Sequence, residues 1–333
     1  MKIAIVILNW NGRQLLEEFL PSVCKYSSNA DIYVADNAST DDSIAYVQSE
    51  FPNVKIVVNS TNGGYAKGYN EALVKIDTDI YCLLNSDVAV TDGWLAPIRE
   101  TFEQDSRIAA VQPKILDYKK KTHFEYAGAA GGFIDKLGYP YCRGRIFDTI
   151  EKDTGQFDDI TPIFWASGAC LFIKKKIFEE VGKFDEDFFA HQEEIDLCWR
   201  IRNNGYIILY NGFSTIYHLG GATLDTMHPR KTFLNFRNNL YLLLKNVNSP
   251  HVYYIIFMRM LLDGLAAFRF ITQGKFPHFW AIFKAHLSFY GNFLTFYRKR
   301  KKLSKMGKYY SIFSVVWQYF ICNQKKIEEI KMS

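Results

Sequence analysis

The chain has 333 residues, with 40 basic against 35 acidic side chains and a formal net charge of +5. At about 150 residues per domain, this length fits two domains or one large domain. Hydrophobic residues make up 48% and charged residues 23% of the chain, which excludes a disordered or collagen-like protein and permits a sizeable core.

The small net charge hides an uneven distribution along the chain. Residues 1–248 carry 26 basic and 32 acidic side chains, a net of −6, whereas residues 249–333 carry 14 basic and 3 acidic ones, a net of +11. The last 85 residues also hold 20 Phe, Tyr and Trp residues, against 34 in the first 248. We therefore expect two parts of different character.

Composition also bears on the compartment. The six cysteines are spread singly without a CxxC pair, so neither a zinc cage nor a disulfide framework is predicted, and a cytoplasmic location is expected. The apolar run at 2–8 is too short for a signal-peptide core. In the basic tail the longest uncharged run is 309–324, with 16 residues, below the roughly 18–20 that a membrane span needs. No transmembrane helix is predicted.

Strands and helices are predicted to alternate through the first half of the chain. Short apolar runs predict buried strands at 2–8, 31–35, 54–58 and 79–84. Between them, apolar residues at three- and four-residue spacing predict helices at 12–25, 41–50 and 65–76. This alternation predicts an α/β fold with a mostly parallel sheet, in which ligands bind beyond the carboxyl ends of the strands.

Polar loops follow three of these strands. They are Asn-Trp-Asn-Gly at 9–12, Asp-Asn-Ala-Ser-Thr-Asp-Asp at 36–42 and Asn-Ser-Asp at 85–87. Turn and helix-cap chemistry is enough to explain the Asn, Asp, Ser and Gly residues of any one loop. Three such loops at one edge of a sheet favour a binding site instead.

The later part of the chain is less regular and then helical. Glycines and aspartates between about 113 and 160 predict an irregular insertion. A strand is expected at 163–173, followed by helices at 174–182 and 193–203. After the Gly-Gly pair at 220–221, further helices are expected at 230–247, 251–273, 277–300 and 308–322.

Two segments in the first half could contact a phosphorylated ligand. A carboxylate such as Asp87, on a tight turn after a buried strand, can reach a divalent cation that holds a diphosphate, and hard oxygen ligands suit Mg²⁺ or Mn²⁺. Asn-Gly-Gly-Tyr-Ala-Lys-Gly at 62–68 places glycines at a helix start, where anions are favoured. This segment matches neither the Walker A pattern nor G-x-G-x-x-G, which argues against a P-loop ATPase and an NAD enzyme.

An acidic cluster and a histidine complete the candidate residues. Glu193 and Glu194 begin a predicted helix and point in different directions because they are adjacent, so one of them could act as a general base. Asp196 and Arg200 are spaced as a structural i,i+4 ion pair. His218 follows a strand-like segment, where a structural role and a metal or phosphate contact are both open. Without a Gly-x-Ser-x-Gly elbow, a hydrolase is not expected.

Six motifs, taken together and in order, resemble family 2 glycosyltransferases, and most closely their rhamnosyltransferase-like branch. The motifs lie at 6–12, 34–43, 62–70, 84–87, 166–169 and 193–200. The resemblance covers residues 1–245 and implies a GT-A fold there, Rossmann-like with a mostly parallel sheet. It also implies a nucleotide-diphosphate sugar donor, a divalent metal (Mn²⁺ or Mg²⁺) and inversion at the anomeric carbon.

The resemblance implies a role for each donor-site residue. Asn9 and Asp36 would line the nucleoside pocket, with Asp36 facing the base or the ribose. Gly64 and Lys67 would lie near the nucleotide. Asn85 replaces the first Asp of the family's Asp-x-Asp motif, and it belongs to the same nucleotide-sugar site.

The reaction centre is implied in the same way. Asp87 matches the metal-binding last position of Asp-x-Asp, and His218 matches a histidine that the family often places near the metal and the diphosphate. Glu194 occupies the position of the catalytic base, where Asp is more usual.

The implied function is an inverting glycosyltransferase in cell-surface polysaccharide biosynthesis. It would move a sugar, with rhamnose as one candidate, to a hydroxyl of a glycan or of a polyprenyl-diphosphate-linked glycan. A non-catalytic sugar-nucleotide-binding scaffold with a degenerate site is the alternative, because Asn85 and Glu194 both depart from the family pattern. A processive synthase is not expected, since the Gln-x-x-Arg-Trp motif is absent.

Residues 246–333 are expected to form a basic, aromatic-rich helical region. In the helix near 253–273 four polar residues fall within about 120° of arc, which predicts an amphipathic helix with a wide apolar face. An aromatic-rich stretch follows and ends in Arg-Lys-Arg-Lys-Lys at 298–302. Aromatic side chains beside basic clusters favour peripheral docking on an anionic membrane, here the inner face of the cytoplasmic membrane. Packing on the core and a homodimer are the alternatives, and nucleic-acid binding is not expected.

Overall fold

The computed structural model describes residues 1–220, 228–300 and 308–330. The chain divides into two compact units. Unit 1 comprises residues 1–133, 142–189 and 193–220. Unit 2 comprises residues 134–141, 190–192 and the described residues after 220.

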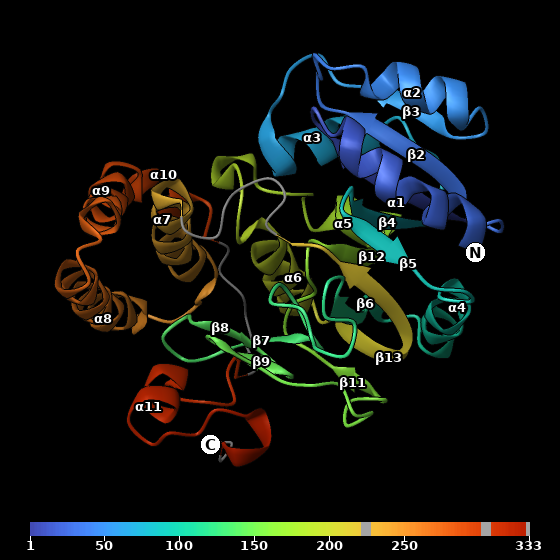
Figure 1. The fold of residues 1–333 in the computed structure, drawn as a ribbon. Helices are drawn as coiled ribbons and strands as arrows, with labels where there is room; N and C mark the ends of the chain where they lie inside the picture. The colour runs from blue at the N-terminus through green and yellow to red at the C-terminus, as the bar shows by residue number, and fades with distance from the viewer. Residues whose placement is uncertain (221–227, 301–307, 331–333) are drawn as a thin grey trace. The chain divides into compact units, whose positions relative to one another are not determined.

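Unit 1 begins with the predicted alternation of strands and helices (Figure 1). Its first elements are β1 (Ile3–Asn9), α1 (Arg13–Tyr26), β2 (Asp31–Asp36), α2 (Ser43–Glu50), β3 (Lys55–Val58), α3 (Gly64–Leu73) and β4 (Ile80–Asn85). The four strands lie in the order β4-β1-β2-β3 and are all parallel. The predicted α/β fold is therefore confirmed in this half of the sheet.

The second half of the sheet mixes strand directions. Its elements are β5 (Val88–Val90), α4 (Leu95–Gln104), β6 (Ile108–Asp117), β11 (Ile160–Pro162), β12 (Cys170–Lys174), α5 (Lys175–Glu180), α6 (Glu193–Asn203) and β13 (Ile207–His218). Strand β12 lies antiparallel between β4 and β6. Strand β13 runs parallel to β6 and antiparallel to both β5 and β11.

The strand expected at 163–173 is correct only at its end, because β12 begins at Cys170. Among the preceding residues, the N–H of Ile163 donates to the carbonyl of Ile208 in β13 and the N–H of Trp165 donates to the carbonyl of Gly132, so the backbone changes its partner from residue to residue. The peptide N–H of Ser167 donates to the side chain of Gln112 at 2.8 Å, and its hydroxyl donates to the carbonyl of Ala127. The expected insertion holds the short strands β7 (Gly132–Ile134), β8 (Pro140–Cys142), β9 (Arg145–Ile146) and β10 (Thr149–Ile150).

Helices cover both faces of the sheet in unit 1. The side chains of Ile3, Ile5 and Ile7 alternate along β1 and join the core formed with α1, α2 and α4. On the other face, Tyr81 of β4 packs its ring against Phe178 of α5 and donates to a carbonyl at the end of α3. Because both faces are buried, polar ligand-binding groups are left to the strand ends.

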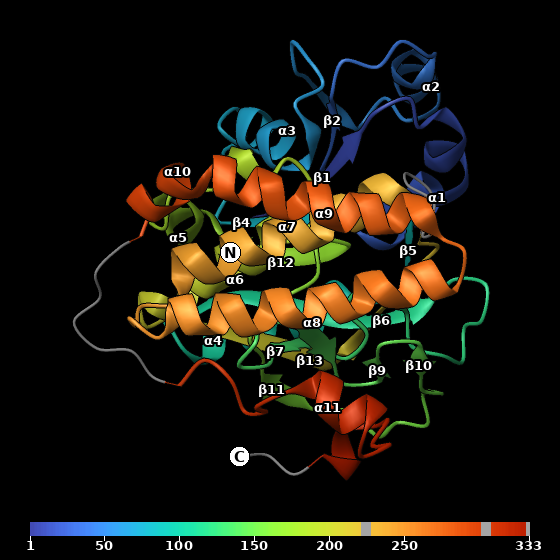
Figure 2. The same cartoon turned by 90° about the vertical axis from the view of Figure 1, so that its left-hand side faces the viewer.

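Unit 2 is mainly helical, as expected for the C-terminal region. Its helices are α7 (Pro229–Asn246), α8 (Val252–Thr272), α9 (Phe276–Gly291), α10 (Phe293–Arg298) and α11 (Val315–Phe320). Figure 2 shows α8 and α9 side by side, with α7 behind them. Among the helices of the described residues, none is long and apolar enough to cross a membrane.

Two expected helices of this region differ in the structure. The helix expected at 277–300 is divided at Asn292, which caps both α9 and α10. The helix expected at 308–322 is shorter in the structure, where only α11 forms. Ser314 is its N-cap and accepts a hydrogen bond from the N–H of Trp317. Residues 301 and 302 of the basic run, and Gly221, lie outside the described residues.

Candidate active site

The predicted polar loops meet at the carboxyl edge of the parallel strands. Asn9, the last residue of β1, lies opposite Asp36, the last residue of β2. On the other side of β1, Leu8 lies opposite Asn85 at the end of β4. The expectation that these loops share one edge of the sheet is therefore confirmed.

Asn9 ties the loop after β2 to the end of β1. Its side-chain N–H₂ donates to Ser43 Oγ at 2.9 Å and to Asp36 Oδ1 at 3.4 Å. Asp36 also accepts from the N–H of Ser39 at 3.1 Å. Both Asn9 and Asp36 are buried, at 0% and 4% exposure. Among the described residues Asn9 Oδ1 has no hydrogen-bond partner, and Gly12 lies so close to it that a Cβ there would stand 2.4 Å away.

A second amide network supports the segment at 62–68. Asn37 donates to Asn62 Oδ1 at 2.9 Å and to the carbonyl of Gly64 at 3.2 Å. Asn59 donates to Asn37 Oδ1 and to the carbonyl of Gly68. These bonds fix the start of α3 at the same edge of the sheet as Asn9 and Asp36.

Gly64 is a position that only glycine fits. Its φ of +78° lies in the left-handed region, and a Cβ there would stand 2.7 Å from the carbonyl oxygen of Phe189. Lys67, one turn into α3, forms an exposed i,i+4 ion pair with Glu71 at 3.6 Å. Gly64 therefore serves close backbone approach, whereas Lys67 keeps a partly exposed ammonium group near the helix start.

Asp87, in the turn after β4, lies next to His218, the last residue of β13. His218 Nε2 lies 3.2 Å from Asp87 Oδ1 and 3.5 Å from the side-chain nitrogen of Asn85. The pairing of β13 with β5 brings them close, because His218 lies opposite Val88. Both side chains are buried, so this contact belongs to the interior of the site and not to its rim.

Glu125 is a member of this cluster that the sequence did not suggest. Its Oε2 lies 3.2 Å from His218 Nδ1, on the ring nitrogen that does not face Asp87. Burial alone would lower the pKa of His218, but the two carboxylates outweigh it and raise the pKa to about 10. His218 therefore carries a positive charge at neutral pH when no metal is bound.

Asp87 and His218 also suit a divalent metal. One carboxylate oxygen and one imidazole nitrogen are ligands that Mn²⁺ accepts, and their separation of 3.2 Å is close to the roughly 3 Å between neighbouring ligands of an octahedral ion. Within the described residues, no group of three or more His, Cys, Asp and Glu side chains is arranged to hold a metal. A bound diphosphate and water can supply further ligands.

Glu193 and Glu194 stand at the start of α6 in different surroundings. Glu193 is 4% exposed, and burial raises the pKa of its carboxyl well above the usual range, with the charge of Glu194 raising it further. Glu194 is less buried. Burial therefore favours the protonated form of Glu193, and Glu194 is the better candidate for a base.

Tyr65 connects these glutamates to the sheet edge. Its hydroxyl donates to the carbonyl of Gly168 at 2.9 Å, and the N–H of Asn85 donates to the carbonyl of the next residue, Ala169, at 3.0 Å. Burial raises the pKa of Tyr65 most, followed by the charges of Tyr69, Glu193 and Glu194. The start of α6 therefore lies near the end of β4.

Asp196 and Arg200 form the predicted structural pair. Asp196 Oδ2 accepts from Arg200 Nε at 2.9 Å, and the Asp196 side chain is fully buried. The two terminal nitrogens of Arg200 donate to the carbonyls of Val181 and Lys183. With its donors used in this way, the pair holds α6 against the end of α5.

An open hollow of about 570 Å³ lies elsewhere in unit 1. It is formed at the amino ends of β1 and β4, with Met1, Asp79 and Lys175 among its lining residues. None of the predicted site residues lines it. Because ligands of such sheets bind at the carboxyl edge, the cluster around Asp87 remains the candidate site.

A family model matches the sequence of this chain directly. The family model described as "Glycosyl transferase family 2" matches residues 4–182, which is more than half of the chain. This chain belongs to glycosyl transferase family 2. It is therefore a glycosyltransferase, and the matched region contains the candidate residues from Asn9 to Asp87.

Two relatives extend the match beyond the family model. The N-acetylglucosaminyl-diphospho-decaprenol L-rhamnosyltransferase of Mycobacterium tuberculosis is 24% identical over 233 residues, which cover 64% of this chain and 75% of the relative. The low-salt glycan biosynthesis hexosyltransferase Agl10 of Haloferax volcanii is 23% identical over 206 residues, covering 60% of this chain and 61% of the relative.

Solved structures agree with the GT-A fold. The crystal structure of GalNAc-T7 with UDP, GalNAc and Mn²⁺ superimposes with a TM-score of 0.56 at 17% identity. The match covers 73% of this chain and 47% of GalNAc-T7. This chain therefore spans about half the length of that protein. The expected fold class is thereby confirmed.

Proposed function

We propose that this chain transfers a sugar from a nucleotide-diphosphate donor to a hydroxyl group of a polyprenyl-diphosphate-linked glycan. The observation that carries the proposal is the cluster of Asp87, His218 and Glu125 at the carboxyl edge of the sheet. Tyr65 links the start of α6, which holds Glu194, to this edge. The mycobacterial relative, which by its name adds L-rhamnose to such a lipid-linked acceptor, supports this acceptor class and makes rhamnose the first sugar to test.

The donor would lie over the ends of β1, β2 and β4. Asn9 and Asp36 would support the nucleoside. Each carboxylate oxygen of Asp36 accepts one hydrogen bond from the described residues and has a second lone pair for a ligand. Gly64 would allow the backbone to approach the nucleotide, with Lys67 at the start of α3 and Asn85 facing the same site. These roles would account for the polar side chains that gather at this edge of the sheet.

The reaction needs one base and one stabiliser of negative charge. Glu194 would accept the proton of the acceptor hydroxyl as that oxygen attacks the anomeric carbon from the side opposite the diphosphate, which inverts its configuration. A divalent metal held by Asp87 and His218 would supply positive charge to the leaving diphosphate. Glu125 would fix the ring of His218 from its other nitrogen.

The acceptor class determines the location that we propose. A polyprenyl-diphosphate-linked glycan is anchored in the bilayer, so the enzyme would work as a peripheral protein at the cytoplasmic face of the membrane. The basic, aromatic-rich composition of residues 249–333 supports that location.

Binding and turnover, measured together, test this function. We would titrate the protein calorimetrically with dTDP-, UDP- and GDP-sugars, with and without Mn²⁺, and assay each donor that binds for transfer to a polyprenyl-diphosphate-linked N-acetylglucosamine. An enzyme binds a donor and releases its nucleoside diphosphate when the acceptor is present. A scaffold binds the donor but releases no nucleoside diphosphate. That result would reject the proposal.

A further inference from the structure

Helix α8 buries a charged pair, Arg259 and Asp263, and exposes its apolar side. Arg259 and Asp263 are 4% and 0% exposed, with Arg259 Nε donating to Asp263 Oδ1 at 2.7 Å. Asp263 also faces His286 of α9 at 3.2 Å, and the guanidinium of Arg259 lies 3.7 Å from the ring centre of Tyr139. The amphipathic helix expected from the sequence is therefore present, but the Arg259–Asp263 pair on its polar side faces the protein, while Arg269 near its end is exposed.

The exposed side of α8 is a stripe of large apolar residues. Its members are between 49% and 67% exposed: Tyr253, Tyr254, Phe257, Leu261, Leu265 and Phe268. At 100° per residue they fall within about 120° of arc, on the side of the helix roughly opposite Arg259 and Asp263. A helix that used its apolar face for packing would bury these side chains.

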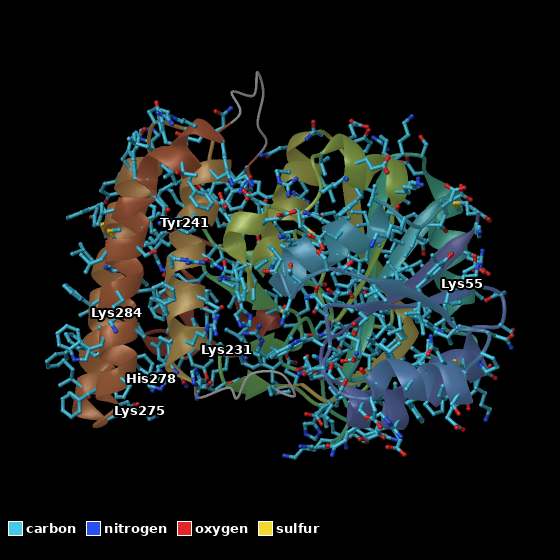
Figure 3. All side chains as sticks on the ribbon, turned by 90° about the horizontal axis from the view of Figure 1, so that it is seen from above. Lys55, Lys231, Tyr241, Lys275, His278 and Lys284 are labelled. Carbon is cyan, nitrogen blue, oxygen red and sulfur yellow. The ribbon has the colours of Figure 1, made fainter. Side chains whose placement is uncertain are left out.

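Helix α9 repeats this arrangement. Five apolar residues, between 48% and 62% exposed, fall within about 80° of arc: Phe276, Trp280, Phe283, Leu287 and Tyr290. The opposite side packs on α7, where His278 Nδ1 lies 2.8 Å from Thr232 Oγ1 and the hydroxyl of Tyr241 donates to the carbonyl of Ser288. Figure 3 labels Tyr241 on α7 and His278 on α9.

The two stripes together form the α8–α9 face, defined by these eleven residues. Helices α8 and α9 lie side by side, so the stripes are adjacent (Figure 2). With about half of a 200 Å² side chain exposed at each position, the face presents on the order of 1,000 Å² of apolar surface. A soluble monomer rarely exposes a patch of more than a few hundred Å².

The charges around the α8–α9 face select one occupant. Between residues 249 and 327 the sequence has a single acidic residue, the buried Asp263. The exposed basic residues include Arg269 on α8, Lys284 on α9 and Arg298 on α10. An apolar surface bordered by positive charge and rich in Tyr and Trp complements anionic lipid headgroups over acyl chains. A second copy would instead oppose two positive surfaces.

We propose that the α8–α9 face docks on an anionic lipid bilayer, with both helices lying in the plane of the interface. The proposal rests on the proposed function, because a lipid-linked acceptor gives the enzyme a reason to be at the membrane. Docking itself requires neither donor nor turnover. It can therefore be tested on the full-length protein without any substrate.

Vesicle flotation tests the proposal. We expect the full-length protein to float with vesicles of phosphatidylcholine and phosphatidylglycerol, and to float about tenfold less with phosphatidylcholine alone or in high salt. Leu261→Ser combined with Phe283→Ser should reduce flotation with the anionic vesicles about tenfold. The matched control is Phe213→Ser, which removes a 61% exposed aromatic ring from unit 1 and should change nothing.

Three results would overturn the proposal. The first is wild-type protein that stays at the bottom with both kinds of vesicle, and the second is a double variant that floats like the wild type. The third is a wild-type dimer, seen by sedimentation velocity, that the double variant converts to a monomer. Wild-type protein that floats with the anionic vesicles but transfers no sugar would reject the proposed function without contradicting the docking proposal.

Discussion

Glu193 and Glu194 are adjacent carboxyl groups that their surroundings make chemically different. Glu194→Gln should lower the rate of sugar transfer by about 10²–10⁴-fold with donor affinity unchanged, because the variant has no base for the acceptor hydroxyl. Glu193→Gln is the control, and it should change the rate only a few-fold, because burial favours the protonated form of that carboxyl. Steady-state transfer rates and donor titration check both. Greater damage from Glu193→Gln would reverse the assignment.

His218 should make the stability of the metal-free protein depend on pH. Its pKa is raised from 6.5 to about 10 in the folded state, so folding favours its protonated form. The resulting stabilisation, on the order of 5 kcal/mol, is fully present below about pH 6.5 and is lost as the pH rises through about 10. Urea unfolding of wild type and His218→Gln across this range measures it. A stability difference that stays constant with pH would contradict the charged pairing.

At this scale the sequence predicted some site residues and could not predict others. Asp87 and His218 were recognisable because each follows a strand, and parallel strands carry such residues to one edge. Glu125 carries no such signal, since it lies in an irregular segment 93 residues before His218. Only the folded chain places its carboxylate at the second ring nitrogen of that histidine.

At the scale of elements, the loop between β3 and α3 requires glycine at position 64. Gly64→Ala should lower the free energy of unfolding by about 1–2 kcal/mol because of the left-handed backbone, and by more because its Cβ would contact Phe189. It should also weaken donor binding. Gly93→Ala is the matched control, because Gly93 has a similar φ of +70° with nothing within 4 Å of a Cβ. Denaturant midpoints and donor titration compare the two. Equal losses would show that the contact with Phe189 carries no cost.

Elements with a clear apolar period were predictable, and elements built on tertiary partners were not. Strand β13 contains Asn211 and Gly212, a pair typical of a turn, yet the strand continues through a bulge. The side chain of Asn211 donates to Thr101 Oγ1 at 2.8 Å, and Ser214 donates to the carbonyl of Trp94 at 2.7 Å. These buried bonds come from α4 and the residue before it, which the local sequence around β13 does not reveal.

For helix α8, the sequence predicted the amphipathic pattern but not its orientation in the protein. Its periodicity placed the polar residues on one side and the apolar residues on the other. Periodicity does not tell which side faces the protein. That choice depends on Tyr139 and His286, which lie far away in the sequence and surround the Arg259–Asp263 pair.

For the whole molecule, the division of charge now has a structural counterpart. Unit 1 holds the candidate carboxylates and the histidine, and unit 2 holds the exposed apolar face with its basic border. The net charge of +5 is the sum of these two parts and describes neither. The reaction and the membrane contact can therefore be perturbed independently, by Glu194→Gln in one unit and by Leu261→Ser with Phe283→Ser in the other.

The anomeric configuration of the product tests the central claim most directly. In the proposed mechanism, a hydroxyl deprotonated by Glu194 displaces the nucleoside diphosphate in one step. NMR of the first-formed product, made with a donor of known configuration, should therefore show an inverted anomeric centre. A product with the configuration of the donor would contradict this mechanism, because retention requires a different reaction path from the single displacement proposed for Glu194.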